Sequence, residues 1–463
     1  MLLPLPLVPF ESYMLADDRP AYPMNCFARL RFSGRFDHAA LDAAMAIAVS
    51  RHPLLAAVVR RFGRQDFWVA ADQPPVVQWL STPPADSLPP LAPLDIRVAA
   101  GLRVVLREDA GRTDLTIQVH HACCDGVGML RFVEDLLVAY ARACGAVPGS
   151  ALRALRPEQL RGRGKFGLTT GKWLRMLPKQ AVGLRGVRRF LMRTPVPLAP
   201  HCSEPENGPP PPGYPASLTR QLDRTESARF LAAARNLGVT ANDLLVRDCF
   251  LALHGWRRRV DGAPDGWLRL AVPMNLRTMA DRRLPAANVA SMVFPERLAR
   301  DLEDPQRLLD SIHQQMSLIK QRQLGLIFVT SLRACRWLPG GLARMVRAKR
   351  CAATAVCTYL GAVLDRCPLP YADDRLVAGD AVLESIDALA PLRPLTCAAI
   401  DVAVYAGQLC VTLHYDSRVL TATDAGELTD EFTARVRESA DTRAVPSPDR
   451  PRSRSEVAAT RGL

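Results

Sequence analysis

The stretch His120-His121-Ala122-Cys123-Cys124-Asp125-Gly126 decides how this chain of 463 residues is interpreted. It follows residues 115–119, where apolar and polar side chains alternate as in a half-buried strand. Because successive side chains of a strand point to opposite faces, one histidine can face a cleft while the other faces the core. Histidine titrates near neutral pH and suits proton transfer. The sequence therefore predicts a chemical site at this strand end.

Several other stretches accompany this motif. Together they resemble the condensation-domain and acyl-CoA-dependent acyltransferase superfamily, with its His-His-x-x-x-Asp-Gly signature, over roughly residues 5–440. The superfamily includes the condensation domains of nonribosomal peptide assembly, wax ester synthases and alcohol acyltransferases. The stretches are Pro9-Phe10-Glu11, residues 37–50 followed by Arg51-His52-Pro53, Val272-Pro273-Met274-Asn275-Leu276-Arg277, Asn288-Val289-Ala290-Ser291, Tyr359-Leu360-Gly361 and Leu413-His414-Tyr415-Asp416.

The resemblance implies an α+β fold, a mixed α/β sandwich. Two similarly folded, CoA-dependent acyltransferase-like lobes would form a V with the active site at their junction, and the chain is also too long for one ordinary domain. Pro209-Pro210-Pro211-Pro212 cannot continue a helix or a central strand and suits a stiff linker. The expected parts are an N-terminal lobe (1–200), a Pro-rich linker (201–216), a C-terminal lobe (217–443) and a disordered tail (444–463).

Local patterns predict the elements around the motif. Asp37 is the expected N-cap of a helix that ends at Ser50, and its apolar residues recur at three- and four-residue spacing. The remaining predictions are strands at 102–107, 115–121, 218–222 and 268–272, helices at 129–143, 225–237 and 240–253, and a hairpin over 401–413 around Ala406-Gly407.

The resemblance also implies roles for the motif residues. His121 would be the general base of an acyl transfer, and His120 would be structural. Asp125 would form a buried salt bridge with Arg277, and Gly126 would permit the turn into the following helix. The alternatives are a core histidine satisfied by hydrogen bonds for His121 and an ordinary surface arginine for Arg277.

Further polar and thiol residues lie near the motif. Asn288 and Ser291 are candidates for positioning the substrate or intermediate, with a polar loop position or a helix cap as the alternative. Cys123 and Cys124 are expected to be small buried residues rather than nucleophiles, since a thioester donor is already activated. No metal site and no permanently bound cofactor are expected.

The net charge of +14 is unevenly distributed. Residues 153–193 carry twelve Lys or Arg and one acid, and residues 333–350 carry six Lys or Arg and no acid, with bulky apolar residues between them. Three interpretations stay open: a solvated basic surface, peripheral contact with an anionic membrane, or docking of an acidic carrier protein or phosphorylated donor. Nucleic-acid binding is not expected, because no recognised binding motif is present.

Composition favours a cytoplasmic location, peripheral at the inner membrane face if the basic segments bind lipid. No uncharged apolar run of 18 residues predicts a transmembrane helix, and the apolar N-terminus contains three prolines and lacks the basic start of a signal peptide. The twelve cysteines include no Cys-x-x-Cys pair, which favours free thiols in a reducing compartment.

The function implied by the resemblance is transfer of an acyl group from a CoA or carrier-protein thioester to a hydroxyl or amine acceptor. The substrates would enter a tunnel between the lobes from opposite sides. A freestanding enzyme like wax ester synthases or alcohol acyltransferases is expected, because no adenylation or carrier domain is attached. The plant hydroxyl acyltransferases are disfavoured, because their second signature, Asp-Phe-Gly-Trp-Gly, does not occur. The alternatives are an amide-forming condensation enzyme on carrier-bound substrates and a non-catalytic binding module of the same fold.

Overall fold

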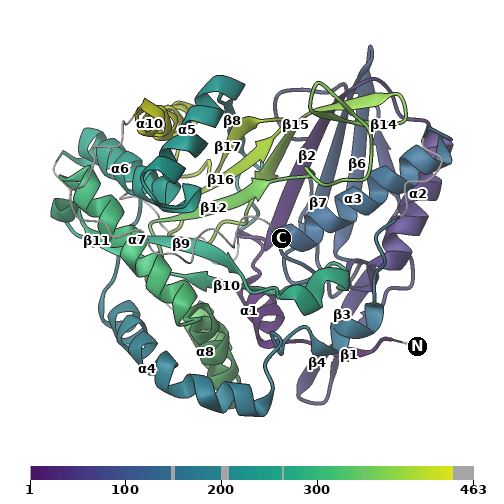
Figure 1. Cartoon of the computed structure of the whole chain (residues 1–463). Helices are drawn as coiled ribbons and strands as arrows, with labels where there is room; N and C mark the ends of the chain where they lie inside the picture. The colour runs from purple at the N-terminus through teal and green to yellow at the C-terminus, as the bar shows by residue number, and fades with distance from the viewer. Residues whose placement is uncertain (1, 147–151, 200–207, 263–264, 348, 442–463) are drawn as a thin grey trace.

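The fold is a mixed α/β arrangement of two seven-stranded sheets flanked by helices (Figure 1). The computed structural model describes residues 2–146, 152–199, 208–262, 265–347 and 349–441. The fold class expected from the sequence is confirmed. The start of the expected linker, up to residue 207, and the expected tail 444–463 lie outside the described residues.

The first large sheet carries the histidine motif. Its order is β13-β14-β15-β2-β7-β6-β5, so three strands from the second half of the chain extend a sheet begun by the first half. β15 pairs antiparallel with β2 and aligns Leu389 with Phe27. Part of segment 217–443 therefore belongs to the sheet of the N-terminal half. The strands are β2 (Asn25–Ser33), β5 (Val77–Leu80), β6 (Leu102–Asp109), β7 (Arg112–His120), β13 (Tyr371–Ala372), β14 (Arg375–Ala378) and β15 (Ala381–Leu389).

The second large sheet has the order β10-β9-β12-β16-β17-β8, with β11 also paired to β9. β12 runs parallel to both β9 and β16, and β16 lies beside β15, so the two sheets adjoin there (Figure 1). The strands are β8 (Ser217–Gln221), β9 (Trp267–Asn275), β10 (Ala290–Val293), β11 (Glu296–Leu298), β12 (Ala355–Ala362), β16 (Ala398–Tyr405) and β17 (Gln408–Tyr415).

Helices cover both sheets, and a three-stranded sheet, β1-β4-β3, lies near the N-terminus. The α-helices are α1 (Pro9–Asp17), α2 (His38–Arg51), α3 (Gly126–Ala143), α4 (Thr170–Met192), α5 (Arg224–Asn236), α6 (Ala241–Asp261), α7 (Pro305–Gln321), α8 (Gly325–Trp337), α9 (Gly341–Val346) and α10 (Ala422–Asp441). The small strands are β1 (Leu5–Pro6), β3 (Ala57–Phe62) and β4 (Gln65–Ala70), and short 3-10 helices cover Pro53–Ala56, Pro157–Gly162, Met279–Arg283 and Ala299–Leu302.

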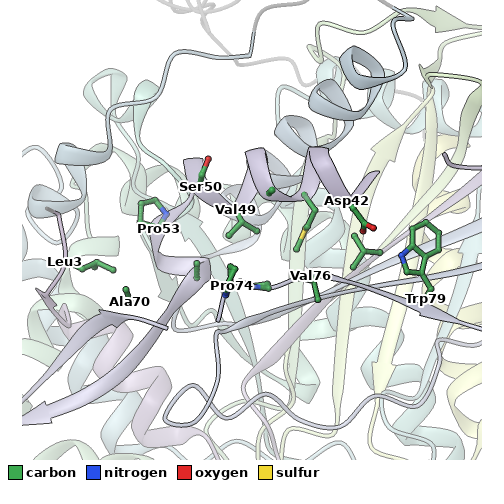
Figure 2. A pocket seen from close by; sticks show the side chains of 14 residues that line it. Leu3, Asp42, Val49, Ser50, Pro53, Ala70, Pro74, Val76 and Trp79 are labelled. Atoms are coloured by element: carbon green, nitrogen blue, oxygen red, sulfur yellow. The ribbon is translucent and has the colours of Figure 1, made fainter. Parts of the chain in front are cut away.

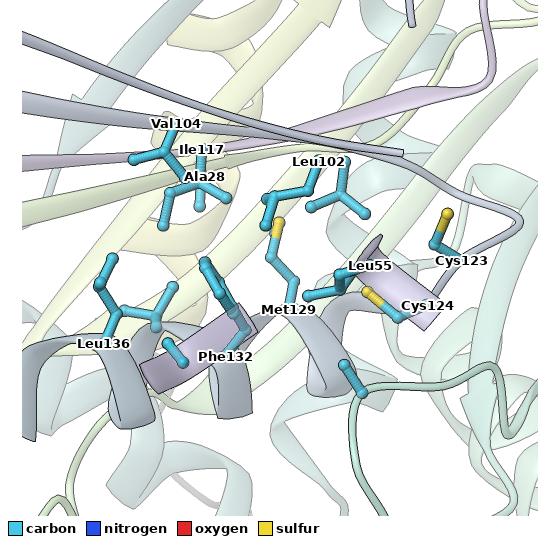
Figure 3. Close-up of a cluster of buried hydrophobic side chains, with 14 of the residues drawn as sticks. Ala28, Leu55, Leu102, Val104, Ile117, Cys123, Cys124, Met129, Phe132 and Leu136 are labelled. Carbon is cyan, nitrogen blue, oxygen red and sulfur yellow. The ribbon is translucent and has the colours of Figure 1, made fainter. Parts of the chain in front are cut away.

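The core of the N-terminal half lies between its sheet and helices α2 and α3. Met129, Phe132 and Leu136 of α3 face Val104 and Ile117 of the sheet, and all five are buried (Figure 3). This is the face that the apolar spacing of α3 predicts, since residues three and four apart share one side of a helix. A second buried cluster joins the other sheet to helices α5, α6 and α10.

The helices and strands that local sequence signals predicted are present. Asp37 caps α2 by accepting a hydrogen bond from the Ala40 amide at 2.7 Å, as expected. The hairpin of β16 and β17 turns at Ala406 and Gly407, which both have positive φ angles. α3 begins at Gly126, three residues before its predicted start, because Asp125 accepts from the Gly128 amide and caps the helix there.

Candidate active site

The two histidines of the motif occupy different environments at the end of β7. His120 is fully buried; its Nδ1 accepts from the Ala122 amide at 3.1 Å, and its Nε2 lies 3.5 Å from a carboxylate oxygen of Asp18. Burial would raise the pKa of Asp18, but His120 and the Met24 amide hold that pKa below its ordinary value. His120 thus belongs to the polar interior.

His121 is partly exposed and lines a cavity. Its Nδ1 lies 3.1 Å from the backbone oxygen of Cys124. A carbonyl oxygen only accepts, so Nδ1 carries the proton and donates, and the lone pair of the neutral ring resides on Nε2. Burial lowers the pKa of His121, partly offset by these backbone contacts and by Asp125. The imidazole is therefore neutral at pH 7 and has one basic nitrogen.

The ion pair implied for Asp125 and Arg277 is present. The guanidinium donates one hydrogen bond to each carboxylate oxygen, both at 2.8 Å, and also donates to the Ala287 carbonyl at 2.8 Å. The carboxylate accepts two more bonds at 2.9 Å, from the amides of Gly128 and Val289. Burial would raise the pKa of Asp125, but Arg277 and the two amides hold it below its ordinary value. The charged Asp125 carboxylate therefore fixes this loop through its hydrogen bonds, none of which is made with His121.

Asn288 lies against the same loop. Its side-chain amide donates to the backbone oxygens of His121 and Ala122, both at 2.8 Å, so it holds the backbone that carries the histidine. Ser291 is buried and lines the cavity, and its hydroxyl donates to the Gly325 carbonyl at 2.5 Å. The structure thus brings Asn288 to the motif loop and Ser291 to the cavity wall.

At the start of α3 the glycine that permits a close backbone approach is Gly128, whereas sequence reasoning had assigned this role to Gly126. A Cβ atom there would lie 2.8 Å from Cβ of Cys124 and 3.0 Å from the amide nitrogen of Ala287. At Gly126 the nearest atom would be a flexible Leu360 methyl at 3.2 Å. The Gly-x-Gly spacing at the start of α3 was the available signal.

Cys123 and Cys124 are free thiols with no exposed surface, in the core beneath the sheet (Figure 3). Burial raises the pKa of both thiols well above the ordinary value, which leaves them protonated. A protonated, buried thiol is a poor nucleophile.

The cavity beside His121 has a volume of about 370 Å³ and is lined from both large sheets and from α1. Its walls are mostly apolar, which suits a small-molecule site with a few placed polar groups. Sequence reasoning missed most of the residues that line this cavity, because they come from segments that lie far apart in the chain. The lining residues include Phe10, Tyr13, Met14, Met24, Val127, Met129, Met274, Met292, Val356, Tyr359, Leu360 and Leu389.

Two acidic groups of this wall were also missed. Asp17 is buried and ion-paired with Arg393, which lines the cavity as well. Asp401, on β16, is buried and accepts from the Ala390 amide at 2.8 Å. Burial raises the pKa of Asp401 to about 7, an effect the amide only partly offsets. Asp401 is thus a titratable carboxyl in the same cavity as His121.

A separate hollow of about 680 Å³ lies between α2 and the segment that leads into β5 (Figure 2). It is lined by Val49, Pro53, Val76, Trp79 and other mostly apolar residues, and Asp42 is the one ionisable side chain among its described lining residues. A single exposed carboxylate offers no acid–base pair, so the His121 cavity is the better candidate. Across the described part of the chain, no group of three or more His, Cys, Asp or Glu side chains is arranged to hold a metal ion.

Comparison with known proteins connects this geometry to a fold. No protein-family model matches the chain. Two curated relatives from Mycobacterium tuberculosis, the uncharacterized proteins MT2362 (strain CDC 1551 / Oshkosh) and Rv2305 (strain ATCC 25618 / H37Rv), are each 28% identical over 299 residues. The match covers 62% of this chain and only 65% of the length of each relative.

Three solved structures that resemble the chain over most of its length are domains of peptide synthetases. The first condensation domain of the CDA synthetase has a TM-score of 0.66 and 16% identity, covering 95% of this chain and 96% of that domain. A variant of the starter condensation domain of rhizomide synthetase in complex with C8-CoA has a TM-score of 0.67 and 14% identity, covering 94% and 95%. The epimerization domain from the third module of tyrocidine synthetase B has a TM-score of 0.65 and 14% identity, covering 95% and 96%.

Proposed function

Starting from the condensation-domain fold, we propose that this protein is an acyltransferase that uses His121 as its general base. The observation that carries the proposal is the state of His121 in the cavity. Its Nδ1–H donates to the Cys124 carbonyl, which leaves the Nε2 lone pair as the basic site of a neutral ring. A neutral imidazole at the operating pH is what a general base requires.

The proposed reaction balances with one imidazole. Nε2 of His121 removes the proton from the acceptor hydroxyl or amine as that group attacks the thioester carbonyl. The carbon–sulfur bond breaks when the tetrahedral intermediate collapses, and the thiolate takes the proton from the imidazolium. The products are an ester or amide and a free thiol, and the imidazole returns to its neutral state. No covalent acyl-enzyme is required, which agrees with the protonated state of Cys123 and Cys124.

The residues around His121 act as positioning groups in this proposal. Asn288 holds the backbone of the His121 loop, and the Asp125–Arg277 pair ties that loop to the segment after β9. His120 supports the loop from the buried side, Gly126 starts α3 at the cavity wall, and Ser291 contributes to the wall itself.

The donor in this proposal is an acyl-CoA or an acyl group on a carrier protein, and the thioester is a co-substrate rather than a bound cofactor. One structural neighbour was solved with C8-CoA, which supports CoA as a donor. Amide-forming condensation on carrier-bound substrates is the second candidate, because several of the neighbours are condensation domains of synthetases. We also propose that the reaction is like that of wax ester synthases or alcohol acyltransferases and that the substrates enter from opposite sides. The protein would be a freestanding cytoplasmic enzyme. In the described part of the chain, no helix is long and apolar enough to cross a membrane.

The test is a thiol-release assay with purified protein, acyl-CoAs of several lengths and pooled alcohol and amine acceptors. Wild-type protein should release thiol only when an acceptor is present, and His121→Ala should lose this release while its thermal unfolding curve stays that of a folded protein. His38→Ala is the matched control, because His38 is mostly exposed, stacks on Trp79 and does not line the cavity.

Release that persists in His121→Ala would overturn the assignment of the base. Release with acyl-carrier proteins and amine acceptors alone would favour the condensation reaction. If the wild-type protein binds acyl thioesters but releases no thiol from any donor, the result would favour a non-catalytic binding module.

A further inference from the structure

Helix α4 (Thr170–Met192) lies at the edge of the molecule beside α8 (Figure 1). Its C-terminal end meets the second large sheet, where the guanidinium of Arg269 on β9 lies over the Phe190 ring. One face of α4 is held against the body. A Cβ atom at Gly183 would lie 1.7 Å from the Cδ1 atom of Ile327 on α8, so the two helices approach closely at this glycine. Gln180 donates to the carbonyls of Arg322 and Gln323 at 3.1 and 3.0 Å. These contacts fix which side of α4 faces outward.

The outward face carries bulky apolar side chains. Leu184 is 65% exposed, Leu191 is 61% exposed and Met192 is 70% exposed. Leu184 and Leu191 are seven residues apart, two turns of helix, and therefore share one face. Neither leucine belongs to a buried apolar cluster of the described residues. Exposed leucines at helical spacing indicate a surface that meets an apolar phase.

Cations surround this apolar stripe. Arg185, Arg188 and Arg189 are exposed, and the sequence of α4 contains no Asp or Glu. The Nε group of Arg188 lies 3.3 Å from the sulfur of Met192, so this guanidinium sits beside the stripe. An amphipathic helix with an apolar face flanked by arginines suits the interface of a bilayer with anionic headgroups.

The second basic segment, residues 333–350, behaves differently. Several of its arginines donate to backbone carbonyls of the protein itself: Arg336 to Leu7 at 3.1 Å, and Arg350 to Phe190 and Leu191 at 2.6 and 2.9 Å. Arg350 thereby anchors the end of α4 to the body. This segment supports α4. Among its described side chains Leu338, at 62% exposed, is the one exposed large apolar group, so these side chains form no equivalent stripe.

We propose that the outward face of α4 docks on an anionic phospholipid bilayer, with Leu184, Leu191 and Met192 in the interface and Arg185, Arg188 and Arg189 at the headgroups. An acidic carrier protein would satisfy the arginines, but an acidic surface offers less apolar area to the leucines than a bilayer does. A bilayer satisfies both groups, because its headgroups are anionic and its acyl boundary is apolar.

The position of α4 connects this surface to the proposed site. A hollow of about 950 Å³ is lined by Arg175 and Met176 of α4 and also by Met274, Arg277 and Tyr359, which line the His121 cavity. If the proposed acyl transfer holds, a lipid-soluble substrate would pass from the membrane along this hollow to His121. Docking itself does not rest on the proposed function.

The test is co-sedimentation of the full chain with vesicles of phosphatidylcholine alone and with vesicles that also contain phosphatidylglycerol. Wild-type protein should bind the anionic vesicles and release them at high salt, because headgroup contacts are screened. The double variant Leu184→Ser/Leu191→Ser should bind roughly tenfold less. Val98→Ser is the matched control, since Val98 is 75% exposed and lies outside α4. Thermal unfolding verifies that each variant is folded.

Equal binding of the double variant and wild type would overturn the proposal, as would equal binding to both kinds of vesicle. Binding to an acidic carrier protein without binding to vesicles would also overturn it. His121→Ala should bind vesicles as the wild type does, so a failure of the proposed chemistry and a failure of docking are distinguishable.

Discussion

Arg277 donates one hydrogen bond to each carboxylate oxygen of Asp125, both at 2.8 Å, although 152 residues of sequence separate them. The same carboxylate caps α3 and accepts from the Val289 amide. The loop that carries His121 is therefore tied at its far end to the strand region of the other sheet. The position of the imidazole depends on this pair even though the pair does not touch Nε2.

Loss of the arginine should destabilise the protein strongly. Arg277→Ala leaves a buried carboxylate with no ionic partner, and such a change typically costs about 3–5 kcal/mol of the free energy of unfolding. The exposed pair of Arg224 and Asp374 supplies the control, because Arg224→Ala should cost about 0–1 kcal/mol. Denaturant unfolding measures both variants. An equal loss of unfolding free energy in the two variants would show that the buried pair stabilises the protein no more than the exposed pair does.

Gly128 should tolerate a methyl group poorly. Gly128→Ala places a Cβ atom 2.8 Å from that of Cys124 and 3.0 Å from the backbone nitrogen of Ala287, and overpacking of this kind costs about 1–3 kcal/mol. Gly126→Ala is the matched change, since its nearest contact is a flexible Leu360 methyl. Thermal unfolding should rank Gly128→Ala as the less stable variant. The reverse order would contradict the packing described for this helix start.

The activity should depend on pH through His121. Burial lowers the pKa of this imidazole below its ordinary value of 6.5, so the ring takes up a proton only at a lower pH than a free histidine does. If His121 is the base, kcat/KM should fall on the acidic side with a midpoint below pH 6.5, since the protonated ring cannot accept a proton. Thiol release at a series of pH values measures the midpoint. A midpoint above 6.5 would point to another group.

Asp401 should make stability decline as pH rises. Its pKa in the folded protein is about 7, against an ordinary value of 3.8. Between these values the folded state keeps a proton that the unfolded state has released, so the free energy of unfolding falls as pH rises across this window and levels off above it. Asp401→Asn cannot ionise and should lack this component. Denaturant unfolding of both proteins from pH 4 to 8 tests the difference; parallel curves would contradict it.

The elements with local signals were predicted well. The alternation before His120 and the cap at Asp37 are short-range patterns, and the corresponding strand and helix are present. The strand at 381–389 was not predicted, and its partner is β2, more than three hundred residues away. A window of neighbouring residues carries no information about which distant edge a strand will meet. The start of α3 was misplaced because the cap of Asp125 lies within the motif itself.

The resemblance carried by the sequence implied the fold class. The sequence by itself also determined the strand before His120 and the cap at Asp37, because periodicity and side-chain capping act over a few residues. Tertiary structure alone decided that Asn288 holds the His121 loop and that Asp401 shares the cavity with His121. It also decided that α4 packs on α8 at Gly183 and leaves Leu184 and Leu191 exposed. Each of these depends on contacts between segments far apart in the chain. Such contacts arise where sheet edges pair and helices pack, and the residues of a short segment do not determine either the pairing or the packing.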